Sequence, residues 1–600
     1  MRIFGKWLHE ILVILLIVFL SLLFQNCSNS KAQSENPNVI IIVTDDMGYG
    51  DLSFTGNKNI STPHIDSLAK TGVSFTNFYV SPVCSPTRAE LLTGRYHPRS
   101  GVYGTSAGGE RMDLDETTIT EVFRQAGYST GIFGKWHNGM QYPYHPNARG
   151  FDEFYGFASG HWGDYFSPNL LERNGKLVSG EGYIVDDFTN KALSFIEDHK
   201  GDLFFAMLTY NTPHSPMQVP DRWWNQFDED ELEMLHRDPE KEDLTFTRAA
   251  LAMVKNIDWN VGRLTAKLEE LGLEENTILI FMSDNGPNSW RWNDGMKGRK
   301  GSVDEGGVRS PLFIQWRNNI EEGKTINHIA SVIDLLPTLA DLAEIELEIQ
   351  KTLDGVSLKP LLLNEVDSLQ DRFLYSHWNG RISIRSQNWR YNIDGELYNM
   401  IQDPGQRMDV AKDHPELVQK MADSLDKWER EVLSELNTDS DDERPFPVGY
   451  PDFLHTQLPA RDGIPHGGIQ RSNRYPNDTF FQNWTTLRDS ITWDVEVLES
   501  GWFDVQLYYT TRQEDLGSTI QLSFGNNKIS FQITEAHDSP LEGMENDRVE
   551  RIESYVKDFK PMDTGTIYLE KGRGLLTLKA LEIPGNQVMD VRLLMLTRTE

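Results

Sequence analysis

Apolar runs that are typical of buried strands alternate with helical patterns from Asn38 onward. Four of these runs have few polar interruptions: residues 38–46, 129–137, 203–214 and 277–286. A continuous apolar run predicts a strand that is covered on both faces. Between the runs lie stretches such as 245–272, where apolar positions recur at intervals of three and four and indicate a helix. The alternation predicts an α/β domain built around a mainly parallel sheet.

The pattern changes towards the C-terminal end of the chain. Residues 370–436 hold shorter strand-like runs and a closing helical stretch, which predict a small sheet beside the main domain. Residues 437–478 are polar and rich in Pro and Gly, so we expect a linker. Over 479–600, apolar and polar residues alternate with a period of two, as in an all-β sandwich. We therefore predict a first domain over 36–436, whose small-sheet part begins at about residue 340, followed by the linker and the sandwich.

Charge narrows the classes of partner. The 600 residues carry a formal net charge of −33, and 38% of them are hydrophobic. That hydrophobic share is ordinary for a globular protein. A strongly acidic chain lacks the basic face that nucleic-acid binding needs, so we expect no nucleic-acid partner. An anionic substrate would have to enter a local basic pocket against the field of the whole protein.

The N-terminal residues have the pattern of an export signal. A basic start precedes an apolar run from Ile11 to Phe24, which is short for a membrane span, and a polar tether follows. Cys27 stands where a bacterial lipoprotein carries its lipidated cysteine, but the residues before it fit that signal poorly. Residues 1–27 thus predict a signal peptide, either of the lipoprotein type or simply cleaved. Both place the protein in the periplasm or at the cell surface, and the first anchors it by lipid to the outer membrane.

The chain has two cysteines, and the second, Cys84, begins the stretch "CSPTRAELLTGR". Ser85 and Pro86 would begin a helix, and Cys84 could simply be a small buried apolar residue at its start. Exported proteins commonly pair their cysteines, and lipidation or removal of Cys27 leaves Cys84 without a partner. A solitary thiol in an exported protein indicates reactivity or modification.

Each of the four strand-like runs ends in polar residues: Asp45 and Asp46, Lys135 and His137, His214, and Asp284 with Asn285. Ligands of open parallel sheets bind outside the carboxyl ends of the strands, so we expect these side chains to meet. The acidic and amide groups among them offer only oxygen ligands. Such ligands suit a hard divalent cation, calcium in preference to magnesium. The competing interpretation is that Asp45 or Asp46 caps the following helix.

A basic set accompanies the candidate metal ligands: Arg88, Lys135, His137, His214 and Lys300. Lys300 lies in a Gly-rich stretch with Lys297 and Arg299, and a solvated loop is the competing interpretation for these three, expected to hold for at least one of them. Cys84 precedes a predicted helix N-terminus, and such an end favours an anion. Metal, helix end and basic residues together predict a pocket for a tetrahedral oxyanion.

The stretch "CSPTRAELLTGR" resembles the maturation signature of type I sulfatases, C-x-P-[ST]-R followed by Thr-Gly. The similarity continues through "TDDMGYGDL", "GKWH", "TPH", "SDNG", "KGSVDEGGVRSP" and "ELYNMIQDPGQ", and it covers about residues 36–435. This resemblance implies an alkaline-phosphatase-like fold and a sulfuric ester hydrolase. It also implies that a formylglycine-generating maturation enzyme oxidises Cys84 to 3-oxoalanine (formylglycine), whose hydrate is the nucleophile.

The resemblance further assigns the cation to five ligands: Asp45, Asp46, the modified Cys84, Asp284 and Asn285. A metal at this place polarises the sulfate group and acidifies the attacking hydroxyl. Asp284 would also serve as a base towards the hydrate.

The remaining roles that the resemblance implies concern anchoring and proton transfer. Arg88 and Lys135 would anchor the hydrate and offset the charge that develops in the transition state. His214 together with Lys300 would protonate the departing oxygen. His137 would accept the proton whose removal releases the sulfate.

Substrate-binding residues are predicted in the aromatic stretch 150–166 and in the small sheet: His161, Trp162 and His377. Packing in the core is the competing interpretation for each of them. Export and the appended β-domain favour a sulfated polysaccharide or oligosaccharide, such as algal ulvan or carrageenan, over a free aryl sulfate. The β-domain would either bind carbohydrate through Trp493, Trp502 and Tyr508 or support the first domain structurally.

Two other functions are compatible with the residues. One is a phosphonate or phosphate ester hydrolase of the same superfamily that also uses formylglycine, although the second set of ligands of a two-metal phosphatase is missing. The other is an exported glycan-binding lipoprotein whose sulfatase-like domain is inert. It would need a broken nucleophile or metal set, and the sequence shows neither.

Overall fold

A computed structural model of the protein describes residues 36–436 and 444–599. The predicted signal peptide and Cys27 therefore lie outside the described residues. Within the described ranges, no helix combines the length and the apolar character that a membrane crossing requires.

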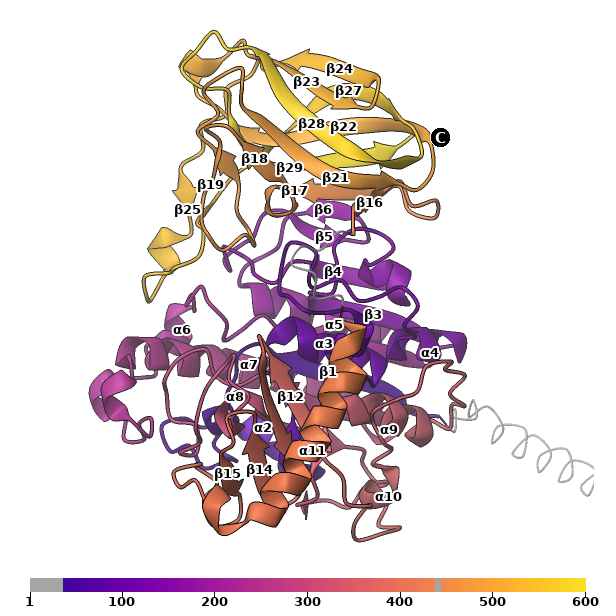
Figure 1. Ribbon diagram of the computed structural model, residues 1–600, viewed down its shortest axis with the longest axis vertical. Helices are drawn as coiled ribbons and strands as arrows, with labels where there is room; N and C mark the ends of the chain where they lie inside the picture. Colours follow the sequence, from indigo (N-terminus) through magenta and orange to yellow (C-terminus); the bar gives the residue numbers. More distant parts are fainter. Residues whose placement is uncertain (1–35, 437–443, 600) are drawn as a thin grey trace, which may run out of the picture. The chain divides into compact units, whose positions relative to one another are not determined.

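An 11-stranded, mainly parallel sheet forms the centre of the first domain (Figure 1). Its strands are β1 (Asn38–Thr44), β2 (Val73–Tyr79), β3 (Ser129–Lys135), β4 (Glu153–Phe157), β5 (Leu171–Arg173), β6 (Lys176–Val178), β7 (Phe204–Thr209), β8 (Thr277–Ser283), β9 (Arg309–Gln315), β10 (Lys324–Ile326) and β11 (Ala330–Ser331). The spatial order is β10-β2-β9-β8-β1-β7-β3-β4-β5-β6, with β11 beside β2. The four predicted strands β8, β1, β7 and β3 are adjacent and parallel, which confirms the predicted fold class.

Strand β1 shows why its sequence is apolar throughout. All seven of its residues are buried. Val39, Ile41 and Val43 pack into one hydrophobic cluster, whereas Ile40 and Ile42 pack into a second one. Because successive side chains of a strand point to opposite faces, both faces of the sheet are covered.

Helices supply the other side of each cluster. Towards the first cluster lie α3 (Cys84–Thr93), α4 (Ile119–Gln125), α9 (Leu335–Leu342) and the short α10 (Lys359–Leu362). Towards the second lie α2 (Pro63–Lys70), α5 (Ile184–Asp198) and α7 (Leu244–Leu271), and α6 (Asp221–Trp224) and α8 (Glu305–Val308) are single turns. The predicted helix 245–272 corresponds to α7. Its N-terminus is capped by the Asp243 side chain, and Gly272 ends it at a φ of 67° that glycine adopts readily.

A four-stranded antiparallel sheet follows, as predicted for residues 370–436. It consists of β12 (Leu374–Trp378), β13 (Arg381–Arg385), β14 (Trp389–Asn392) and β15 (Leu397–Asn399), in that spatial order. The closing helix α11 (Pro415–Val432) packs on it through Met421, Leu425 and Trp428, which share a buried cluster with Ile382 and Ile384 of β13.

Two six-stranded sheets form the C-terminal domain. One contains β16 (Phe446–Val448), β18 (Ile464–His466), β21 (Ser490–Val497), β23 (Thr519–Phe524), β24 (Asn527–Gln532) and β28 (Gly572–Glu582). The other contains β17 (His455–Pro459), β19 (Gln470–Arg471), β20 (Phe481–Gln482), β22 (Gly501–Thr510), β27 (Lys560–Leu569) and β29 (Asp590–Arg598). Trp493 and Leu594 belong to different sheets and to one buried cluster, so the sheets face each other as a sandwich.

The predicted linker 437–478 differs from the structure. Residues 437–443 lie outside the described ranges, but the rest supplies strands β16 to β19 of the sandwich. Strand β17 pairs with β29, and β16 pairs with β21. Strands β16 to β19 are two to five residues long, and the first three contain proline, so they lack the alternating pattern from which the later strands were predicted.

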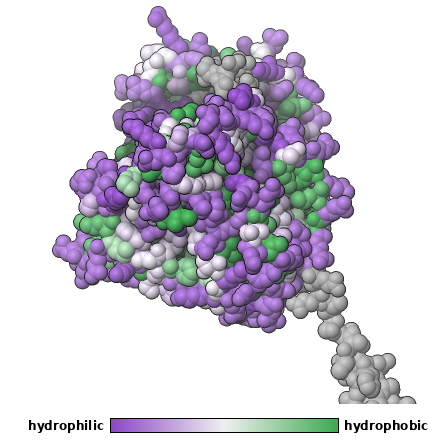
Figure 2. All heavy atoms as spheres, turned by 60° about the horizontal axis from the view of Figure 1, so that its bottom comes forward, coloured by the Kyte–Doolittle hydropathy of each residue, from purple (hydrophilic) through white to green (hydrophobic). Residues whose placement is uncertain are grey.

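The aromatic residues predicted as carbohydrate platforms of the sandwich are mostly internal. Trp493 is fully buried, and its indole donates a hydrogen bond to the carbonyl oxygen of Pro459. Tyr508 is also buried, whereas Trp502 is 54% exposed. Only Trp502 of the three is open to a ligand. The face drawn in Figure 2 is largely hydrophilic, with apolar residues scattered over it, as the acidic composition suggests.

Candidate active site

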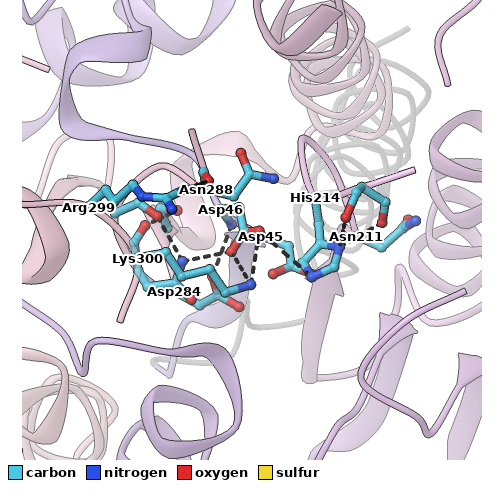
Figure 3. Close-up of polar contacts among 12 residues, drawn as sticks. Asp45, Asp46, Asn211, His214, Asp284, Asn288, Arg299 and Lys300 are labelled. Carbon is cyan, nitrogen blue, oxygen red and sulfur yellow. Dashed lines mark hydrogen bonds and ion pairs between the residues drawn. The ribbon is translucent and has the colours of Figure 1, made fainter. Parts of the chain in front are cut away.

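The polar residues that follow the four parallel strands meet in space, as the topology predicted. The backbone N–H of Asp46 donates to Asp284 Oδ1 at 3.2 Å, although the two residues are 238 positions apart. The Asn285 amide donates to Asp46 Oδ1 at 2.8 Å. Figure 3 shows the carboxylates between Lys300 on one side and His214 on the other.

The backbone adopts unusual conformations where two strands end in the site. Asp46 has a φ of 66° and His137 a φ of 68°, both in the left-handed region that residues other than glycine rarely enter. Such conformations persist where the surrounding structure fixes them, and they concentrate at functional sites. Here they turn the chain sharply at the carboxyl ends of β1 and β3.

Cys84 is the first residue of α3 and is buried. Its Sγ atom lies within 4.8 Å of a carboxylate oxygen from Asp45 and one from Asp284, and these two oxygens are equally close to each other. A second group of the same dimension joins Asp45 and Asp46 to His214. The thiol thus sits at a helix N-terminus, where backbone N–H groups favour an anion, and beside two carboxylates that could hold a metal ion.

Buried cations neutralise these carboxylates. Lys135 Nζ lies 2.7 Å from Asp45 Oδ2, and both side chains are at most 1% exposed. Arg88 contacts Asp284 Oδ2 at 2.9 Å through Nη2 and donates from Nη1 to the carbonyl oxygen of Lys135. Lys300 Nζ lies 2.7 Å from Asp46 Oδ1. Each carboxylate of the cluster therefore has its own cationic partner.

The cluster still has unused oxygen ligands. Among the described residues, Asp45 Oδ1 and Asn285 Oδ1 are buried and have no hydrogen-bond partner. Burial raises the pKa of Asp284, and the negative charge of Asp45 raises it further despite Arg88. Unpartnered buried oxygens and repulsion between carboxylates are both relieved by a cation. The donor set consists of hard oxygens, so it fits a divalent metal ion of the calcium or magnesium type.

His137 has one nitrogen that is free to accept a proton. Its Nε2 lies 2.8 Å from the carbonyl oxygen of Thr105, so Nε2 carries the hydrogen. Its Nδ1 is buried without a partner in the described chain. Burial lowers the pKa of His137 well below its usual value, and the charge of Lys135 acts in the same direction. The ring is therefore neutral and suited to act as a base.

His214 has a hydrogen-bond acceptor at one ring nitrogen and a carboxylate near the other. Nδ1 donates to the carbonyl oxygen of Ser215 at 2.6 Å, and Nε2 lies 3.7 Å from Asp46 Oδ2. Lys300 contacts the same carboxylate of Asp46. The arrangement is thus compatible with a paired proton donor.

A cavity of about 340 Å³ opens onto Cys84, His137, His214 and Lys300. Of the three predicted substrate-binding residues, only His161 lines it; its ring lies 5.6 Å from that of His214.

The other two predicted substrate-binding residues lie elsewhere. Trp162 is buried and stacks on Phe157 at 5.2 Å. His377 stacks on His97 at 5.5 Å, and its neighbour Trp378 lines the cavity instead. Successive side chains of β12 point to opposite faces, so Trp378 lines the cavity while His377 packs on His97, and substrate binding by His377 stays a prediction.

Sequence reasoning missed several lining residues of this cavity: Thr105, Trp378, Tyr475, Asn477, Ile552 and Glu553. They lie in loops or at strand ends and belong to none of the motifs. The last four come from the C-terminal domain, which lies outside the residues that resemble sulfatases. Only the order of strands and loops in space could reveal them.

Comparison with known proteins now identifies the family. Residues 37–345, more than half of the chain, match the sulfatase family, and residues 290–431 match the C-terminal region of N-sulphoglucosamine sulphohydrolase. The protein belongs to the sulfatase family. It is therefore a sulfuric ester hydrolase, and the family implies a formylglycine and a metal ion, for which candidate ligands surround Cys84.

Individual sulfatases resemble this chain over most of their own length. The N-acetylgalactosamine-6-sulfatase of Mus musculus is 29% identical over 421 residues, which cover 63% of this chain and 77% of that protein. The crystal structure of Ps i-CgsB in complex with k-i-k-neocarrahexaose is 32% identical, with a TM-score of 0.61, and the match covers 68% of this chain and 96% of that one. A sulfatase structure from glycosaminoglycan metabolism of Bacteroides thetaiotaomicron, BT33336S-sulf, is 26% identical, with a TM-score of 0.57 and coverage of 66% and 100%.

Proposed function

We propose that this sulfatase removes sulfate from a sulfated oligosaccharide or polysaccharide, using a formylglycine made from Cys84 and a divalent cation, calcium in preference to magnesium. The observation that carries the proposal is the position of the Cys84 thiol. It lies within 4.8 Å of carboxylate oxygens of Asp45 and Asp284, in a cavity that also presents Lys300 and three histidines. Metal ligands, a helix N-terminus and proton-transfer groups thus surround one side chain.

The cation would be held by oxygens of four residues beside the modified Cys84: Asp45, Asp46, Asp284 and Asn285. When bound, it would polarise the sulfate group and lower the pKa of the attacking hydroxyl. The unpartnered Oδ1 atoms of Asp45 and Asn285 support this ligand set. Calcium is preferred because the ligands are all protein oxygens, whereas magnesium usually keeps several waters.

Arg88 and Lys135 would hold the hydrated formylglycine, which supplies the attacking hydroxyl. Both side chains are buried next to Asp284 and Asp45, so their positions are fixed by ion pairs before substrate enters. Preorganised cations stabilise the charge that develops on the sulfuryl oxygens without rearrangement during the reaction.

The two histidines would divide the proton transfers. His214, hydrogen-bonded through Nδ1 to the carbonyl oxygen of Ser215 and with Nε2 near Asp46, would donate a proton to the departing sugar oxygen together with Lys300. His137, neutral and free at Nδ1, would accept the proton whose removal lets the sulfate leave.

A basic groove beside the catalytic cavity supports an anionic glycan as substrate. A cavity of about 670 Å³ shares Lys300 with the catalytic one, and seven cationic residues line it: Arg237, Lys241, Lys297, Arg299, Lys300, Arg381 and Arg407. Only two acidic residues, Asp238 and Asp304, line it as well. In a protein with a net charge of −33, such a groove provides the local basic pocket that an anionic chain needs. Similarity to a structure that holds a neocarrahexaose supports the same class.

We also propose that the enzyme acts outside the cytoplasm. The N-terminal pattern supports export to the periplasm or the cell surface, with Cys27 either lipidated or removed with the signal. Sulfated algal glycans such as ulvan or carrageenan would be met there.

Two measurements test the proposed function. Mass spectrometry of the peptide that contains Cys84, on protein from the native host, should find the aldehyde or its hydrate in place of the thiol. Release of inorganic sulfate from a panel of carrageenan, ulvan and glycosaminoglycan oligosaccharides should be catalysed by the same preparation, and phosphate esters should be poor substrates. An unmodified thiol in the active native protein, or a higher kcat/KM for phosphate than for sulfate esters of one phenol, would refute the mechanism.

A further inference from the structure

A loop of the C-terminal sandwich contacts the first domain. The antiparallel pair β25 (Leu541–Glu542) and β26 (Val556–Lys557) encloses residues 543–555, which we call the cleft loop. It lies beyond both matched family regions, which end at residues 345 and 431. The family match therefore gives no information about this loop.

Several hydrogen bonds fasten the cleft loop to the first domain. The Gln218 side chain donates to the carbonyl oxygen of Gly543 at 2.7 Å and to Asp547 Oδ1 at 3.0 Å. Arg548 donates from its backbone N–H to the carbonyl oxygen of Met217 at 2.9 Å. The guanidinium of Arg551 is buried, pairs with Asp547 and donates to the carbonyl oxygen of Gly163. A loop with this many buried partners is held in place.

The end of the cleft loop reaches the surroundings of His214. The hydroxyl of Ser215, next to His214, donates to Glu553 Oε1 at 2.5 Å. The carbonyl oxygen of Ile552 accepts a hydrogen bond of 2.9 Å from the side chain of Asn473, which ties the loop to a second segment of the same domain.

That second segment, residues 472–477, touches the surroundings of the other catalytic histidine. The amide of Asn477 donates to the carbonyl oxygen of Thr105 at 3.4 Å, and His137 donates to the same oxygen. The Tyr475 ring is held by Arg474, whose guanidinium lies 4.7 Å from the ring centroid and donates to the tyrosine hydroxyl at 2.7 Å. Both segments of the C-terminal domain are thus fixed beside the catalytic cavity.

Two exposed apolar side chains stand on these segments at the cavity. Ile552 is 64% exposed and Tyr475 is 38% exposed, yet both line the cavity that opens onto Cys84. Ile552 also lines the neighbouring cavity of about 440 Å³, next to Asp46 and His214. Exposed apolar groups beside a polar site commonly mark the part of a ligand that is not charged. In a sulfated sugar, that part is the C–H face of the ring.

We propose that the C-terminal domain completes the active site, and that Tyr475 and Ile552 form a platform for the C–H face of the pyranose ring that carries, or adjoins, the sulfate to be removed. The inference rests on the proposed glycan substrate. It assigns the sugar ring to the C-terminal domain and the sulfate to the first domain. The platform is a substrate-binding element and takes no part in the chemical steps.

Two single variants test the platform: Tyr475→Ala and Ile552→Ser. Loss of one apolar contact with the ring should lower kcat/KM for a sulfated oligosaccharide by about tenfold to a hundredfold, mainly through KM. The kcat/KM for nitrophenyl sulfate should stay within about threefold, because its small ring needs only the sulfate site. Direct titration of the oligosaccharide into the inactive Cys84→Ala protein should show the same loss in Kd.

Matched controls come from the same domain. Met544 lies in the cleft loop and is 52% exposed, and Trp502 on β22 is 54% exposed, but neither lines the cavity. Met544→Ser and Trp502→Ala should leave both substrates unaffected. Since all four side chains are exposed, none of the variants should lower the melting temperature by more than a few degrees.

The outcomes distinguish failure of the platform from failure of the proposed glycan substrate. If the platform variants slow both substrates equally, or change neither, the platform is wrong while the proposed function stands. If the wild type hydrolyses nitrophenyl sulfate but binds and hydrolyses none of the sulfated oligosaccharides, the glycan assignment fails and the platform fails with it.

Discussion

The two domains differ in where they place their charges. At the carboxyl ends of the main sheet, Lys135 and Asp45 form an ion pair in which both side chains are at most 1% exposed. On the sandwich, Arg573 and Asp494 form a pair of similar length in which the side chains are 50% and 36% exposed. An exposed pair contributes about 0–1 kcal/mol to stability, whereas burying ions costs several kcal/mol per ion before their attraction is counted. The cost of burying Lys135 and Asp45 is expected if the pair takes part in the proposed reaction, whereas the surface pair contributes little to stability.

The largest expected effect comes from replacing a buried carboxylate of the site and, for comparison, an exposed one of the sandwich. Asp284→Asn should reduce sulfate release by at least about a thousandfold, because a metal ligand and the partner of Arg88 are both lost. The matched change Asp494→Asn on the sandwich should leave kcat/KM and the melting temperature nearly unchanged. Steady-state kinetics and thermal unfolding of both variants measure the contrast. Equal activity in the two variants would show that the buried carboxylate has no special role.

A second prediction tests whether His214 protonates the leaving group. His214→Ala should lower turnover of a sulfated oligosaccharide by about 10²–10⁴-fold, because a sugar alkoxide needs a proton to leave. Nitrophenolate leaves without that help, so nitrophenyl sulfate should keep much of its rate. Parallel kcat values on the two substrates test this. A uniform loss on both would argue against a role in leaving-group protonation.

His137→Ala should fail at a later step. The variant is expected to release about one equivalent of phenol or sugar alcohol per active site in a burst and then to turn over at a steady-state rate about 10²–10³-fold below the wild type. Rapid-mixing experiments with nitrophenyl sulfate would show the burst. A slow linear trace with no burst would place His137 before the departure of the leaving group.

Removal of the metal should lower the thermal stability of the first domain and leave that of the sandwich unchanged. If the cation is present at about a thousand times its Kd, binding stabilises the first domain by about 4 kcal/mol, and a chelator removes that contribution. The melting transition of the first domain should therefore fall in chelator and recover with calcium more than with magnesium, whereas the sandwich transition should not move. Calorimetry with and without chelator measures both. Full activity in protein verified as metal-free would contradict the site.

The smallest predicted effect concerns Glu90 in α3, the helix that begins at Cys84. Burial raises its pKa from 4.5 to about 8, although Ser81 and the His97 backbone donate to it. The folded state thus holds the proton more tightly than the unfolded state, so this contribution to stability is complete below pH 4.5 and declines as the pH rises towards about 8. The decline should reach about 3 kcal/mol between about pH 5 and pH 8. Glu90→Gln should remove it, so its melting temperature should gain on the wild type as the pH rises; parallel pH profiles would contradict the shift.

Particular residues show how far prediction from sequence reached. The sequence allowed the prediction that Asp45, Lys135 and Asp284 lie close together. Each stands at the end of an apolar run, and parallel strands end at one edge of a sheet. Strands with strict alternation, such as β21, were also predictable. The short strand β17 was missed because its pairing partner, β29, lies more than a hundred residues away and its own pattern is weak.

The sequence by itself determined the parallel sheet, the order of the domains and the position of the chemistry around Cys84. These follow from local periodicity and from a motif, and both are written in neighbouring residues. Tertiary structure alone decided which side chains line the cavity: Trp378 instead of His377, a buried Trp162, and Tyr475 and Ile552 from the second domain. Those choices depend on the direction of single side chains and on contacts between segments hundreds of residues apart, which no local pattern records.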